Sequence, residues 1–168
     1  MSDGSISQDE IDALLAGVDM GGMGTSSASS SKTFSDAQKT ALNTFFGNIK
    51  PSVKSNYDSM TGSGISVDGP EISVMTRDGL LKSLPEMVVA TVVDFSGGLS
   101  GDHIFLQSPE LAGKLVSLVN NEPGAELDDM ALSVLSETIS QHVGAELTEM
   151  EKNGISGVAN QPAETVHV

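Results

Sequence analysis

The 168-residue sequence has no cysteine, no tryptophan and few basic residues. Disulfide bonds are therefore excluded, and the thiolate ligands of a typical structural zinc site are missing. Only eight Lys and Arg stand against 23 Asp and Glu, which gives a net charge of −15. Nucleic-acid binding draws on clustered basic side chains, and these eight are scattered, so we expect none. The acidity favours solubility and a partner that carries basic side chains.

Long apolar runs are also missing. The longest, residues 87–93, is too short to span a bilayer, and the N-terminus lacks the basic and apolar regions of a signal peptide. We therefore expect a cytoplasmic protein. His103, His142 and His167 are far apart in dissimilar contexts, which favours ordinary surface or half-buried histidines over metal ligands. We expect no metal site.

Residues 1–16 carry a complete set of helix signals. Ser7 and Glu10 have the spacing of a capping box, and Ile6 and Ile11 have that of a hydrophobic staple. So short a helix is marginal alone in water, and the residues that follow offer its apolar stripe no partner. The segment therefore predicts a peptide that binds another protein. The residues expected to contact that protein are Ile6, Ser7, Gln8, Asp9, Glu10, Ile11, Asp12, Leu14 and Leu15.

Residues 17–32, rich in Gly, Ser and Met, predict a flexible linker, and residues 33–168 are long enough to form a folded domain. Ser35 and Gln38 form a second capping box, which begins a helix that ends at a turn over 61–64. Pro51 is expected to kink this helix near Gly47. Further expected elements are an extended segment over 65–75, a β-hairpin from 87–95 and 103–107, a helix after Ser108, a buried helix over 126–152 and a final strand.

This order of elements predicts an α/β (α+β) fold, with helices packed on a mainly antiparallel sheet. The glycines of the hairpin turn, 96–101, can suggest a phosphate-binding loop. No lysine or helix start follows in the right place, which favours a plain turn.

The sequence of this domain also contains an internal repeat. Aligning Asp36 with Asp128, an offset of 92 residues, places two predicted helices on each other. The same offset places Pro70 on Pro162, and each proline precedes a short segment expected to be extended, 71–74 and 163–166. The alignment predicts a first repeat over 35–122 and a second, incomplete repeat over 126–168.

Two of these features resemble known families. The segment Ser7-Gln-Asp-Glu-Ile-Asp-Ala-Leu-Leu15 resembles the N-terminal CheY-binding peptide of FliM/FliY-type flagellar switch proteins. The repeated pattern is similar to the signature of the CheC/CheX/FliY family, a Glu-x-x-Asn followed 22 residues later by Pro. The resemblance implies a CheC-like pseudo-repeat. FliY-type members also carry a C-terminal FliN-like domain, for which this sequence has no segment, so we expect a truncated product or a fragment.

In that family the resemblance implies hydrolysis of an aspartyl phosphate on the response regulator CheY. The Asn carboxamide orients the attacking water, and the Glu one turn earlier binds a lysine of CheY. Mg²⁺ is bound by CheY, so no cofactor is expected here. When this signature is placed on the two repeats, the first repeat keeps the Asn as Asn48 but has Phe45 in place of the Glu. The second repeat keeps the Glu as Glu137 but has Ser140 in place of the Asn. Gln141 carries an amide but lies about 100° further around the helix. We expect neither centre to be fully active.

Simpler interpretations stay open for the same residues. Phe45 can be a packing residue at the core edge, Asn48 a solvated helix residue and Glu137 a surface charge. The leading prediction is a flagellar motor switch component that captures phosphorylated CheY through its N-terminal segment. Its neighbours would be FliM, FliN and FliG, at the flagellar basal body on the inner face of the membrane. One alternative is a CheY-phosphate phosphatase with degenerate centres, Asn48, Glu137 and Ser140, and another is an incomplete domain that folds poorly.

Overall fold

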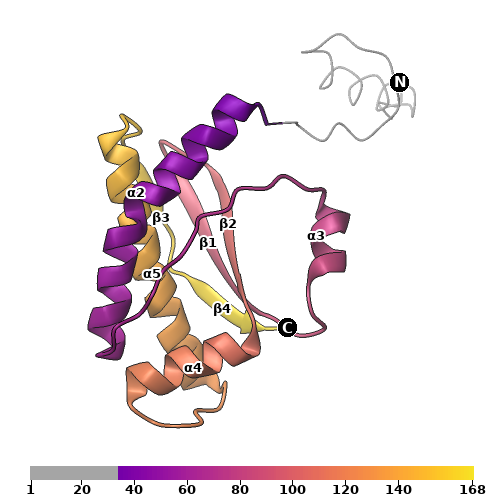
Figure 1. Ribbon diagram of the computed structural model, residues 1–168, viewed down its shortest axis with the longest axis vertical. Helices are drawn as coiled ribbons and strands as arrows, with labels where there is room; N and C mark the ends of the chain where they lie inside the picture. The colour runs from indigo at the N-terminus through magenta and orange to yellow at the C-terminus, as the bar shows by residue number, and fades with distance from the viewer. Residues whose placement is uncertain (1–33) are drawn as a thin grey trace, which may run out of the picture. The chain divides into compact units, whose positions relative to one another are not determined.

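Two long helices, α2 (Asp36–Thr61) and α5 (Asp129–Lys152), run side by side and antiparallel in the computed structural model, which describes residues 34–168 (Figure 1). The other helices are α3 (Arg77–Ser83) and α4 (Pro109–Asn120), and the strands are β1 (Val89–Gly97), β2 (Gly101–Gln107), β3 (Val158–Asn160) and β4 (Glu164–His167). None of these described helices is long and apolar enough to cross a membrane. The predicted N-terminal helix, the linker and the boundaries of both lie outside the described residues and stay predictions.

Strand β1 is the centre of a four-stranded antiparallel sheet. It pairs with β2 along one edge, from Val89 opposite Gln107 to Phe95 opposite Gly101. Along its other edge it pairs first with β4 and then with β3. The mixed fold of helices and antiparallel sheet is therefore the class that the sequence predicted, and the predicted hairpin and final strand are present.

Local capping explains where the helices begin. The Ser35–Gln38 capping box is formed at the start of α2, and the helix continues through Pro51 to a left-handed C-cap at Gly62. Ser108 caps α4, with Pro109 in its first turn. The side chain of Asp128 accepts a hydrogen bond from the Ala131 N–H. Helix α5 therefore begins at Asp129, not at Glu126 as predicted, because this cap fixes the start.

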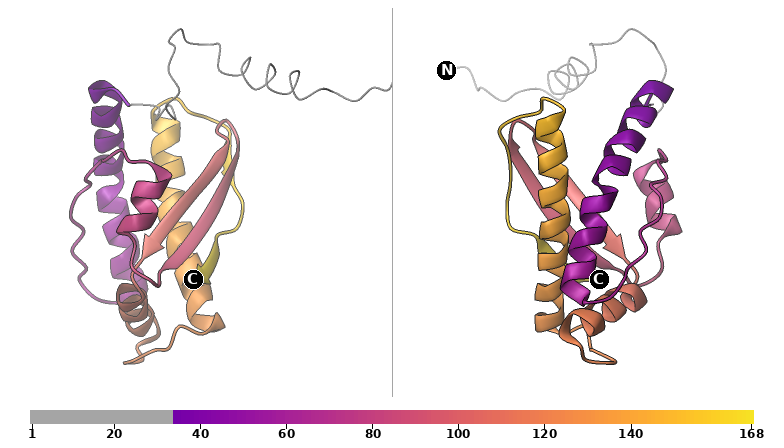
Figure 2. Two further views of the ribbon diagram at one scale, coloured as in Figure 1. Left: turned by 90° about the vertical axis from the view of Figure 1, so that its right-hand side faces the viewer. Right: turned by 60° about the vertical axis from the view of Figure 1, so that its left-hand side comes forward.

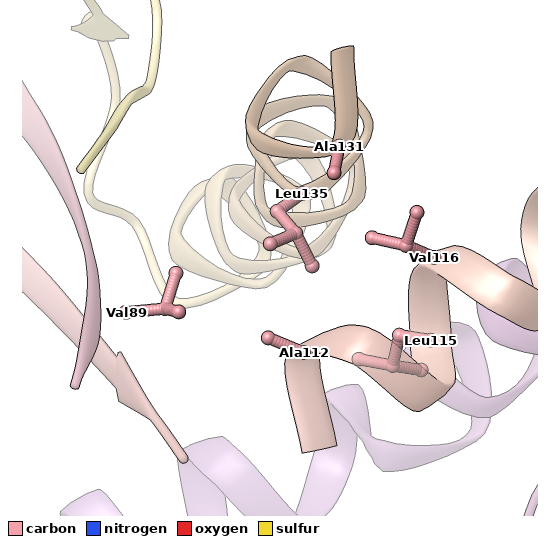
Figure 3. Packing of buried hydrophobic residues seen from close by; sticks show 6 residues of the cluster. All are labelled: Val89, Ala112, Leu115, Val116, Ala131 and Leu135. Atoms are coloured by element: carbon pink, nitrogen blue, oxygen red, sulfur yellow. The ribbon is translucent and has the colours of Figure 1, made fainter. Parts of the chain in front are cut away.

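The core lies where α5 covers β1 and meets α4 (Figure 3). Val89 of β1, Ala112 of α4 and Leu135 of α5 are fully buried there. A second cluster further along α5 joins Val93 to Ile139 and Val143. Helix α2 packs on α5 and α4 and adds the partly buried Tyr57 to the first cluster (Figure 2).

The segment 65–75, which was expected to be extended, joins no sheet in the described part of the chain. Residues 77–83 form α3, which was not predicted. The corresponding segment of the second repeat does form β4. Both edges of β1 are occupied by β2, β3 and β4, which leaves no place beside β1 for the earlier segment. Strand β3 was also missed, since three residues carry too little alternation to be recognised.

The structure corrects the alignment of the repeat by one residue. The N-caps of α2 and α5, Ser35 and Asp128, are 93 positions apart, not 92. Asn48 then corresponds to Gln141, and Asn56 corresponds to Glu149. Two hydrogen bonds between the helices obey this relation: Asn48 bonds to Glu149, and Asn56 bonds to Gln141. Exchanging the helices converts one contact into the other, so α2 and α5 pair with a local twofold relation.

Candidate functional site

A polar groove lies between α2 and α5 and contains Asn48, the amide that the sequence singled out. Its volume is about 380 Å³. Small residues at the middle of the pair, Ser52 of α2 with Gly144 and Ala145 of α5, leave room for it. The other residues that line it are Ile49, Asn56, Gln141, Thr148, Glu149 and Lys152.

Glu149 fixes the orientation of the Asn48 carboxamide. Asn48 Nδ2 donates to Glu149 Oε1 at 2.9 Å, and Asn153 Nδ2 donates to the same oxygen at 3.2 Å. Lys152 Nζ lies 3.6 Å from Glu149 Oε2. The hydrogen bond from Asn48, with smaller contributions from Asn153 and Lys152, lowers the pKa of Glu149, so its carboxylate stays charged.

This arrangement leaves one atom of Asn48 available for chemistry. The carbonyl oxygen Oδ1 makes no hydrogen bond to the residues that the structure describes, and the side chain is exposed. An amide oxygen in this position can accept a hydrogen bond from water or from a bound group. The groove therefore holds a pre-oriented acceptor beside a buried, charged carboxylate.

Helix α5 places the other two predicted site residues elsewhere. Glu137 is exposed and its Oε1 accepts a hydrogen bond from Gln141 Nε2 at 3.3 Å. The Ser140 hydroxyl donates to the Ser136 carbonyl oxygen at 2.9 Å within the same helix. Neither residue lines the groove or bonds to Asn48. The structure therefore does not bring the three residues together.

Three residues of the groove were missed by the sequence analysis. Glu149 and Asn56 were not considered, and Gln141 was set aside because it follows Ser140 by one position. The signal for all three is the repeat at an offset of 93, which places Gln141 on Asn48 and Glu149 on Asn56. Phe45 is half-buried, and its ring lies edge-to-face against Phe46 at 5.2 Å between centroids.

A second charged cluster lies between α5 and the hairpin. Glu146 is 1% exposed, and His103 Nδ1 lies 3.1 Å from its Oε2. His142 Nε2 lies 3.2 Å from Oε1, at ion-pair distance but without the alignment of a hydrogen bond. The His103 ring stacks on Phe105. Among the described residues no group of three or more His, Asp or Glu has an arrangement that could hold a metal ion.

The arrangement of α2, α5 and the sheet is that of flagellar motor switch proteins. FliY from Thermotoga maritima superposes with a TM-score of 0.73 at 16% identity, covering 81% of this chain and 71% of that one. A chain of the FliG–FliM complex from H. pylori superposes with a TM-score of 0.66 at 16% identity over 78% of this chain and 75% of that one. In a FliM–SpeE complex from the same organism the TM-score is 0.68 at 15% identity, over 80% and 71%.

The sequence itself is similar to one of these proteins. It is 25% identical over 155 residues to the flagellar motor switch phosphatase FliY of Bacillus subtilis, covering 89% of this chain. The chain spans 40% of the length of that relative. No protein-family model matches the sequence. The chain therefore has the fold of the FliY and FliM structures and is similar in sequence to FliY, which confirms the predicted resemblance.

Proposed function

We propose that this chain is a flagellar motor switch component that binds phosphorylated CheY through residues 6–15. Its similarity to FliY over 89% of its length is the observation that carries the proposal. The capping box and apolar stripe of the N-terminal segment supply the binding element, an amphipathic helix that lies in a groove of its partner. A Gly/Ser-rich linker would tether this helix and raise the local concentration of CheY beside the motor.

The fold supports the remaining part of the proposal, contact with neighbouring switch proteins. FliM, FliN and FliG are the partners we infer, because two structures of similar fold are complexes of FliM, one of them with FliG. The site of action would then be the flagellar basal body at the cytoplasmic side of the membrane.

Deletion of residues 1–32 tests CheY binding. The truncated chain should lose its affinity for CheY activated with beryllofluoride, measured by titration calorimetry. In the full chain, Leu14→Asp should weaken binding at least about tenfold, because it places a charge on the apolar face. Met20→Asp in the linker is the matched control and should bind as the native chain does. Undiminished binding after the deletion would refute the proposal.

A second candidate function is phosphatase activity on phosphorylated CheY. The exposed Asn48 Oδ1 in the α2–α5 groove favours it, because a water bound there would be oriented for attack on a phosphoryl group docked at the groove. Phosphate release should then be faster with the native chain than with Asn48→Ala. Glu137→Ala and Ser140→Ala, measured beside it, report whether the second repeat takes part. If the native chain does not accelerate release, this function is excluded.

A further inference from the structure

Gln141 stands on α5 where Asn48 stands on α2. The two positions differ by the same 93 residues as the N-caps of the two helices, Ser35 and Asp128. Both amide side chains line the polar groove, and Gln141 is half-buried. Asn56 Nδ2 donates to the Gln141 carbonyl oxygen at 3.2 Å, so a bond from α2 fixes the backbone that carries the second amide.

A carboxylate orients each of these two amides. Glu149 Oε1 accepts from Asn48 Nδ2 at 2.9 Å, and Glu137 Oε1 accepts from Gln141 Nε2 at 3.3 Å. Glu149 reaches its amide from the opposite helix, whereas Glu137 lies one turn before Gln141 on α5 itself. In both pairs the amide oxygen accepts no hydrogen bond from the residues that the structure describes. The groove therefore holds two amide oxygens with the same available chemistry.

We propose that Gln141 is a second catalytic amide for the phosphatase activity considered above, and that Glu137 is its positioning residue. The inference rests on that proposed activity. Asn56, which bonds to the backbone of Gln141, is eight residues beyond Asn48 on α2, so the two amides lie about 12 Å apart along the helix pair. This separation is too large for one water molecule to contact both, so each amide forms a centre of its own.

The chemistry at each centre is the hydrolysis of the aspartyl phosphate of CheY. A water molecule donates one hydrogen bond to the amide oxygen, which leaves a lone pair of the water to face phosphorus. The water oxygen forms a bond to phosphorus while the bond from phosphorus to the aspartyl oxygen breaks. The aspartate leaves as a carboxylate, and a water proton passes to a phosphoryl oxygen, which gives dihydrogen phosphate. The protein contributes the position of the water, so the placement of the amide oxygen determines its effect on the rate.

Ser140, the rival residue for the second centre, does not have this placement. Its hydroxyl donates to the Ser136 carbonyl oxygen at 2.9 Å, and it does not line the groove. The serine oxygen is also two bonds closer to its own backbone than the amide oxygen of glutamine. The structure therefore favours Gln141 over its neighbour as the residue that holds the water.

Phosphate release from phosphorylated CheY, measured with the full chain and its variants, tests the assignment. Asn48→Ala should keep about half of the native acceleration, because one of two similar centres remains. Adding Gln141→Ala to Asn48→Ala should lower the rate to that of CheY alone. Adding Gln161→Ala, an exposed glutamine outside the groove, is the matched control and should leave the remaining rate unchanged. A remaining rate that survives Gln141→Ala, or that Ser140→Ala removes instead, would overturn the proposal.

Two variants of Glu137 distinguish positioning from a structural role. In the Asn48→Ala background, Glu137→Ala should lower kcat at least about tenfold and leave KM unchanged, because it releases the Gln141 amide without touching residues 6–15. Glu137→Gln keeps an acceptor oxygen for that amide and should restore kcat. Failure of this rescue would overturn the positioning role.

The same proteins show which proposal fails. Each variant should bind beryllofluoride-activated CheY as the native chain does, and this titration measures the proposed CheY binding separately from hydrolysis. If the native chain accelerates phosphate release but Gln141→Ala has no effect in the Asn48→Ala background, only the assignment of Gln141 is wrong. A native chain that does not accelerate release excludes the phosphatase activity, and the second centre with it.

Discussion

Glu146 illustrates at the residue scale how a carboxylate stays charged inside a core. Burial by itself raises its pKa, but the hydrogen bond from His103 and the nearby His142 outweigh burial, and the net effect lowers the pKa. The two imidazoles come from different elements, β2 and α5, so the carboxylate also joins the hairpin to the helix. A buried charge paired in this way contributes to stability only while it is ionised.

We predict that Glu146→Gln lowers the free energy of unfolding at pH 7 by about 1–3 kcal/mol, because the imidazoles lose a charged partner. Since the folded-state pKa lies below the ordinary value of 4.5, the contribution is fully present above pH 4.5 and is lost as pH falls through the folded-state pKa. Urea unfolding between pH 7 and pH 3 measures the difference. Glu137→Gln, an exposed carboxylate on the same helix, should change stability by less than about 0.5 kcal/mol. A difference that stays constant down to pH 3 would contradict the prediction.

At the scale of elements, two glycines determine how β3 approaches β1. A Cβ atom on Gly97 or Gly98 would lie 2.1 Å from a carbonyl oxygen, that of Gly157 or Ser156 respectively. Backbone carbonyls cannot move as flexible side chains do, so only glycine allows the two strands to meet here. From the sequence these glycines were expected in a turn, because the close approach of a distant strand leaves no local signal.

We predict opposite effects for two glycine-to-alanine changes. Gly98→Ala should destabilise the fold by about 1–3 kcal/mol, since the new methyl group overlaps the Ser156 carbonyl and must displace β3. Gly47→Ala is the matched control. It lies inside α2 with nothing within 4 Å of its Cβ position, so alanine should stabilise the helix by up to about 1 kcal/mol. Thermal unfolding of the two variants measures the sign of each change in stability, and two changes of the same sign would refute this account.

At the scale of the whole molecule, the α2–α5 pair joins two halves of the sequence. Helix α2 packs mainly on α5 and α4, and the bonds of Asn48 to Glu149 and of Asn56 to the Gln141 carbonyl hold it to α5 at two separated points. The polar groove lies between these points. The same pairing that holds the fold together therefore creates the candidate site.

We predict that Asn48 and Glu149 are energetically coupled whereas Asn48 and Asn56 are independent. In a double-mutant cycle, Asn48→Ala and Glu149→Ala should together cost less than the sum of the single changes, because each removes the same bond. Asn48→Ala and Asn56→Ala should add, since their bonds lie more than two turns apart on α2. Urea unfolding of the six proteins gives both cycles. Additive changes in the Asn48–Glu149 cycle would mean that the hydrogen bond between these two side chains does not form in solution.

Much of the fold could be read from local patterns. The Ser35–Gln38 box, the Ser108–Pro109 helix start and the β-branched run of residues 87–95 each depend on neighbours in the sequence, and each predicted an element that is present. The site was harder to predict, because the orientation of the Asn48 side chain depends on Glu149, which is 101 residues away in the sequence. Only a correct register of the repeat connects the two, and an error of one residue turns a helical position by about 100°.

The sequence by itself determined the three longer helices α2, α4 and α5, the hairpin and the resemblance to flagellar switch proteins, because capping, β-branched runs and short motifs act over a few residues. The tertiary structure alone decided that residues 71–75 stay unpaired while β4 pairs. It also decided that Asn48 meets Glu149 rather than Glu137. Both outcomes depend on which surfaces are free once α5 covers β1, and packing between distant segments settles that competition.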